Sequence, residues 1–140
     1  MRGLKLSDQH PKLVLIINKL TENTIAGKIY WNHIEKNVYQ TGELVGYLIE
    51  ISRQSTQRNV LDAYYVEEEF FILRILRNHN NAPQRPVMET NNLLLAKEIG
   101  EFKATSLMEQ LYDAAKKSST GAIVAMNEIL NFLLQEKKEN

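Results

Sequence analysis

Residues 64–77 constrain the fold of this chain more than any other stretch, because they read as a strand whose residues 70–76 are apolar on both faces apart from Arg74. One face carries Phe71, Leu73 and Ile75, and the other carries Phe70, Ile72, Arg74 and Leu76. A strand with one solvent-exposed face alternates regularly between apolar and polar residues. This strand is therefore either central and covered on both sides, or it presents an apolar face to a partner.

The same period of two predicts further strands before and after this one. They are expected near residues 29–31, 38–41, 45–52 and 87–90, with polar connections at 32–37, 54–59 and 78–86. Trp31 is in phase with Ile29, so we expect it in the core. Residues 93–101 fit a strand and a helix equally well, and both alternatives stay open.

Helical spacing marks both ends of the chain. Leu13, Ile16, Ile17 and Leu20 predict a helix over residues 8–26, which Gly27 ends. Apolar residues recur in the same way over residues 104–117 and again over 121–134. Strands followed by helices indicate an α+β fold.

We therefore predict a single domain, residues 1–140, with 1–7 and 135–140 as loose ends. It consists of an N-terminal helix, an antiparallel meander of three to five strands, and two C-terminal helices packed on the sheet.

Charge and composition narrow the possible partners. The chain has 17 basic and 17 acidic residues. Proteins that bind nucleic acid mainly through phosphate contacts usually have more basic than acidic residues. This balance argues against a general nucleic-acid binder. There is no cysteine, which excludes disulfides and thiolate chemistry and fits a cytoplasmic protein. No run reaches the ~18 apolar residues of a membrane helix, so no membrane contact is predicted.

Several segments resemble a group of small bacterial and phage-borne proteins of unknown function. Residues 20–31 match an opening in which a helix ends in Thr-x-x-Gly-Lys-Ile-x-Trp, here Thr24 to Trp31. Residues 46–51, 71–75 and 111–115 and a final amphipathic helix are similar too. The resemblance implies the α+β fold and brings no activity with it.

Catalytic motifs are missing. The chain has no phosphate-binding glycine loop, no H-E-x-x-H and no G-x-S-x-G, so we predict no catalytic residue, no metal and no cofactor. The histidines His10, His33 and His79 are expected in separate loops or helix starts. An enzyme would need His33 or His79 to lie against Glu67 or Glu69, and this is the third-ranked hypothesis.

Arginines gather between residues 53 and 85, and arginine suits bidentate recognition of phosphate. The alternative hypothesis is therefore a regulatory protein that binds a nucleotide or another small ligand. Its anion site would use Arg74, Arg77 and Arg85, with Tyr30 as the exposed aromatic neighbour.

The leading hypothesis is a non-enzymatic interaction module that forms a homodimer. It rests on the second face of the central strand and on the apolar stripe of the last helix, whose spacing suits a helix–helix seam. The predicted interface residues are Phe70, Ile72, Leu76, Ile123, Met126, Leu130 and Leu133.

Overall fold

A computed structural model describes residues 6–61, 64–78 and 86–138 and has the predicted α+β architecture. The elements follow the order α1 (Leu6–Ile25), β1 (Trp31–Glu35), β2 (Val38–Thr41), β3 (Tyr47–Leu61), β4 (Tyr64–Arg77), β5 (Pro86–Asn91), α2 (Asn92–Ile99), α3 (Glu101–Ser119) and α4 (Ala122–Lys138). The undecided stretch is therefore helical: Asn91 accepts the N–H of Leu94 through its side chain and caps α2.

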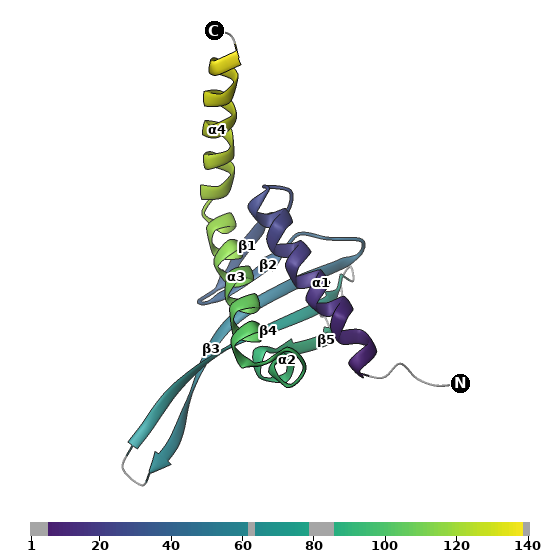
Figure 1. Cartoon of the computed structure of the whole chain (residues 1–140), viewed down its shortest axis with the longest axis vertical. Helices are drawn as coiled ribbons and strands as arrows, with labels where there is room; N and C mark the ends of the chain where they lie inside the picture. The colour runs from purple at the N-terminus through teal and green to yellow at the C-terminus, as the bar shows by residue number, and fades with distance from the viewer. Residues whose placement is uncertain (1–5, 62–63, 79–85, 139–140) are drawn as a thin grey trace, which may run out of the picture.

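The strands form one antiparallel sheet in the order β1-β2-β3-β4-β5, so each strand pairs with its neighbours in sequence. This is the predicted meander. The helices α1, α2 and α3 lie together on one face of the sheet (Figure 1). The helices α2 and α3 pack on it directly, whereas α1 packs mainly against α3, and α4 also makes its main contacts with α3.

Two predicted connections are wrong, because polar residues also form strands at solvent-exposed edges. Residues 32–35 belong to β1, an edge strand in which every residue after Trp31 is exposed. Residues 54–59 belong to β3. Neither stretch shows apolar alternation, because the side chains of residues 32–35 and 54–57 are exposed and have no buried face to fill.

The strands β3 and β4 continue well beyond the rest of the sheet. They pair from Tyr47–Arg77 as far as Leu61–Tyr64, but β2 reaches only residues 50–52 of β3 and β5 only 72–76 of β4. The outer parts of β3 and β4 therefore form a two-stranded arm that projects from the body (Figure 1). The side chains of residues 54–57 on this arm are polar and exposed.

The core lies between the sheet and the three helices. From α1 it takes Leu13, Ile17 and Leu20, and from the sheet Trp31, Tyr39, Ile49, Ile51, Phe71 and Leu73. The prediction of the buried face of α1 holds except for Ile16, which is 41% exposed. Ile16 fits the apolar spacing but lies at the border of the buried face.

Trp31, the first residue of β1, forms hydrogen bonds with the C-terminal ends of both α1 and α3. Its Nε1 donates to the hydroxyl of Thr24 at the end of α1 (2.8 Å), and its backbone N–H donates to Ser118 Oγ at the end of α3 (3.0 Å). Between Thr24 and Trp31, Gly27 adopts a φ of 78° that ends the helix. The Thr-x-x-Gly-Lys-Ile-x-Trp segment therefore has a structural role in this chain.

Candidate functional site

The last helix, α4, leaves the body of the protein. After α3 the chain turns at Gly121, whose φ of 77° is a conformation that glycine adopts readily. Beyond this turn α4 rises away from the sheet and the other helices (Figure 1). It does not cover the second face of the sheet, so the helix and that face are separate surfaces.

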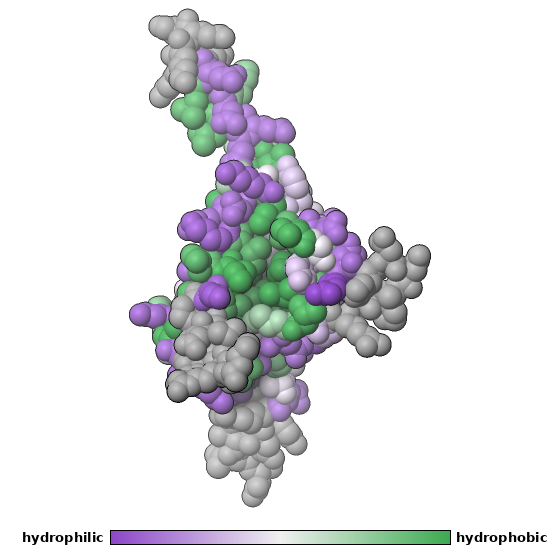
Figure 2. Space-filling view, turned by 90° about the vertical axis from the view of Figure 1, so that its right-hand side faces the viewer, coloured by the Kyte–Doolittle hydropathy of each residue, from purple (hydrophilic) through white to green (hydrophobic). Residues whose placement is uncertain are grey.

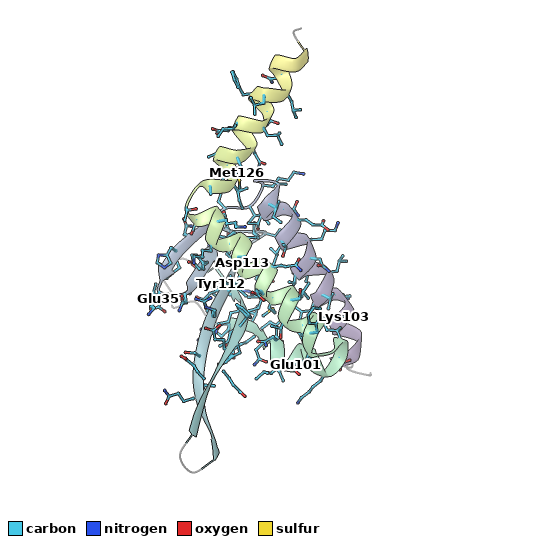
Figure 3. The ribbon with its side chains drawn as sticks, turned by 60° about the vertical axis from the view of Figure 1, so that its left-hand side comes forward. Glu35, Glu101, Lys103, Tyr112, Asp113 and Met126 are labelled. Atoms are coloured by element: carbon cyan, nitrogen blue, oxygen red, sulfur yellow. The ribbon has the colours of Figure 1, made fainter. Side chains whose placement is uncertain are left out.

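Most large apolar side chains of α4 lie in water. Those between 50% and 61% exposed are Met126, Ile129, Leu130, Phe132, Leu133 and Leu134. Apart from Phe132 they fall on one side of the helix, and we call them, with Ile123, the α4 stripe. Figure 2 shows apolar surface along this projecting segment, and Figure 3 shows Met126 clear of the sheet.

The base of α4 is fixed to the body. Ile123, the first residue of the stripe, is only 5% exposed. One turn above it, Asn127 donates from Nδ2 to the carbonyl oxygen of Ile25 at the end of α1 (3.4 Å). A Cβ on Gly27 would lie 3.1 Å from this same nitrogen, so glycine lets α4 approach the turn after α1. These contacts set the direction in which α4 projects.

The sheet residues of the predicted interface lie elsewhere, on the face away from the helices. Leu76 is buried there, beside Leu48 in the register of β3 and β4, while Phe70 and Ile72 are half-buried. This face therefore leaves less apolar surface in water than its sequence indicates. The structure does not bring these residues together with Met126, Leu130 and Leu133.

Arg74 lies on the same face and is held between two carboxylates. Its Nε donates to Glu89 of β5 (2.5 Å) and its Nη1 to Glu50 of β3 (3.3 Å). The hydrogen bond to Glu89 is the largest cause of a raised pKa for Arg74, and burial opposes it. A charge neutralised from both sides is poorly suited to capture a phosphate.

The other residues of the predicted anion site do not join Arg74. Arg77 is three residues away along the strand, so its side chain points to the opposite face, where its guanidinium lies 5.8 Å from the ring centroid of Tyr47. Tyr30 is exposed and precedes β1. Arg85 lies outside the described residues. The anion-binding hypothesis stays a prediction.

Tyr112 is the most notable polar side chain of the interior. It packs against Tyr39 and Phe71 between α3 and the sheet (Figure 3), and the guanidinium of Arg53 lies 5.2 Å from its ring centroid. Its hydroxyl hydrogen-bonds to Asn37 Oδ1 (3.3 Å). Burial raises the pKa of the Tyr112 phenol, and Arg53 lowers it. These contacts serve packing.

No catalytic or metal-binding constellation is found in the part of the chain that the structure describes. No three His, Asp or Glu side chains gather there to hold a metal ion. His33 is exposed and packs 5.2 Å from the ring of Tyr39 on β1 and β2, while Glu67 and Glu69 lie on the arm. His79 lies outside the described residues.

A groove of about 600 Å³ runs over the outer surface of the helices. Val14 and Asn18 of α1 line it, with Ile99 of α2 and Phe102 and Leu107 of α3. It is shallow, and a mixture of apolar and uncharged polar side chains surrounds it, along with Glu98 and Lys103. No group of convergent polar atoms marks it as a site for a particular ligand.

No protein-family model, curated protein or solved structure matches this chain. The resemblance to the bacterial and phage-borne group therefore stays a prediction. Among the described helices, none has a stretch that is both long and apolar enough to cross a lipid bilayer.

Four apolar residues of this surface were missing from the predicted interface: Ile129 and Leu134 on the stripe itself, Phe132 beside it and Ile25 near its base. Phe132 breaks the heptad spacing of the stripe, and Ile25 belongs to another helix altogether, although both are more than half exposed. A helical wheel of residues 122–134 reveals the first. Only the contact between Asn127 and Ile25 reveals the second, because the two lie far apart in sequence.

Proposed function

We propose that this chain is a non-enzymatic interaction module that acts through protein contacts, with α4 as its docking element and a second copy as its partner. The observation that carries the proposal is the exposure of the α4 stripe beyond Ile123. Contiguous apolar patches of several hundred Å² are rare on monomers and usually mark interfaces.

The helical state of α4 supports the same proposal. Isolated helices of about this length are marginal in water, and most helical stability in proteins comes from packing of the apolar face. Beyond its base, α4 has no such packing within the described chain. A partner that binds to the stripe supplies the apolar packing that the rest of the chain does not provide.

A second copy is the partner that the stripe fits best. Ile123, Met126, Leu130 and Leu133 repeat at alternating steps of three and four residues, which is the spacing of a helix that pairs with another helix. The charged residue in this part of α4, Glu128, lies on the opposite side, so two stripes meet without charge repulsion. Twofold dimers are also the commonest closed assemblies.

Leu130→Asp tests the proposal. At high micromolar concentration we expect wild-type protein to scatter light with twice the chain mass of 16.2 kDa, and the variant with the single mass. A charge placed in the middle of the stripe would have to be buried in the dimer, which is strongly unfavourable. Circular dichroism checks that the body of the variant stays folded.

Asn131→Asp is the matched control, since it adds the same charge on the polar side of the same helix. It should leave the dimer intact. A wild-type protein that is monomeric at this concentration contradicts the proposal, and so does a dimer that survives Leu130→Asp. The cytoplasmic location stays a prediction from the sequence.

A further inference from the structure

The body of the protein lies over the lower end of the α4 stripe. Ile123 is buried there, and Asn127, beside the stripe, is bonded to the end of α1. From Met126 to Leu134 the stripe is open. The two ends of α4 therefore differ: the lower end is covered by its own chain, and the upper end is free.

We propose that the second copy lies antiparallel on α4, so that the free end of each helix reaches the end of α1 in the other copy. The inference rests on the proposed function and adds to it the orientation of the partner and a receptor surface outside α4. That surface is the exposed side of Ile25 and the turn at residues 26–30 that follows it.

Steric fit favours this orientation over the parallel one. In a parallel pair, the two Ile123 side chains would lie at the same level, and each is already covered by its own chain there. The end of α1 lies against the base of α4, where Asn127 donates to the carbonyl oxygen of Ile25 and Ile123 is buried. In an antiparallel pair the two bodies lie at opposite ends of the helix pair, and this conflict does not arise.

The area of the interface points the same way. The half-exposed apolar side chains of α4 form one narrow strip along a single helix. A stable complex usually buries about 800 Å² on each partner. Ile25, which is 57% exposed, and the neighbouring Tyr30 extend the apolar surface at the base, where an antiparallel partner ends.

The open part of the stripe also sets the register. Its centre is Leu130, so the twofold axis passes beside this residue. Leu130 then meets Leu130 of the second copy, and Met126 lies near Leu134 of the second copy. A parallel pair would instead place each residue beside its own equivalent.

Disulfide trapping separates the two arrangements, and the natural chain has no cysteine to interfere. We expect Met126→Cys and Leu134→Cys proteins to cross-link when they are mixed and oxidised, because a disulfide requires Cβ atoms about 3.5–4.5 Å apart. Neither variant should cross-link by itself. Leu130→Cys should cross-link alone.

A second measurement addresses the receptor surface. Ile25→Asp should raise the dissociation constant of the dimer at least tenfold. Leu93→Asp is its control, since Leu93 is 56% exposed on α2, away from α4. It should leave the dissociation constant unchanged. Equal effects of the two variants overturn the receptor surface.

The outcomes also distinguish this inference from the proposed function. A dimer in which Met126→Cys cross-links to itself overturns the antiparallel orientation and leaves α4 as the docking element. A dimer in which none of these cysteines cross-links overturns the arrangement altogether. A wild-type protein that stays at the single mass contradicts the proposed function itself.

Discussion

The consecutive helices α3 and α4 have similar lengths, 19 and 17 residues, and both carry an apolar stripe at helical spacing. In α3 the stripe is covered: Met108 and Leu111 are 0% exposed. In α4 the stripe beyond Ile123 stands in water. Helical spacing therefore reveals that a helix has an apolar face to bury, but not whether the same chain covers that face.

The largest expected effect tests the covered helix. Leu111→Ala should lower the free energy of unfolding by ~2–5 kcal/mol, because it opens a cavity in a packed core. We suggest measuring it by urea denaturation in the Leu130→Asp background, where self-association is removed.

Leu133→Ala in the same background is the counterpart on α4. It should cost less than about 0.5 kcal/mol, as a surface change does. Similar losses for Leu111→Ala and Leu133→Ala would contradict the difference between the two helices, because they would mean that α4 is packed within its own chain.

An intermediate effect is expected where α1 meets β1. Thr24→Val removes the acceptor of the Trp31 Nε1–H and leaves this buried donor unpaired. The cost should be about 1–3 kcal/mol of unfolding free energy. The measurement is again denaturation in urea, followed by tryptophan fluorescence.

Thr21→Val is a close control, because both hydroxyls donate to the helical carbonyl four residues earlier, that of Thr24 to Leu20 and that of Thr21 to Ile17. The difference between the two variants isolates the bond to Trp31. Equal losses would show that the Trp31 bond contributes nothing to the attachment of α1, so that the apolar contacts alone hold it.

The smallest expected effect concerns a single proton. Because burial raises the pKa of Tyr112 in the folded chain, the unfolded chain loses this proton first as the pH rises. The contribution of Tyr112 is complete below its ordinary pKa of about 10 and is lost as the pH rises through the folded value.

Wild-type stability should therefore fall more steeply between roughly pH 9 and pH 11 than that of Tyr112→Phe, which has no phenol to ionise. Denaturation curves at both pH values give the two slopes. Identical slopes would indicate that Tyr112 ionises as readily in the folded protein as in the unfolded chain.

Much of the fold was predictable because most of its elements bury a face. The spacing of Leu13, Ile17 and Leu20 reflects the core that α1 covers, and the alternation at residues 71–75 reflects the sheet. The failures fall where burial ends. The mostly polar residues 32–35 and the polar residues 54–59 form strands through backbone pairing, which leaves no pattern in the side chains.

The candidate site was predictable only in part, for a related reason. Met126, Leu130 and Leu133 follow from helical spacing, and they are the predicted interface residues that remain open to a partner. Ile72 and Leu76 follow from strand alternation, but Ile72 is half-buried and Leu76 is buried, and this burial cannot be deduced from residues 70–76 alone. The ion pairs of Arg74 likewise depend on register.

The projecting arm of β3 and β4 has a consequence for amide hydrogen exchange. The N–H groups of Ile49 and Arg53 point away from β4, toward Thr41 and Asn37 respectively. Those of Ser55 and Gln57 point the same way, because alternate residues of a strand share a side, but β2 ends before it reaches them. Deuterium should therefore enter the arm at every second amide within seconds, while the intervening amides, bonded to β4, exchange only as the arm opens.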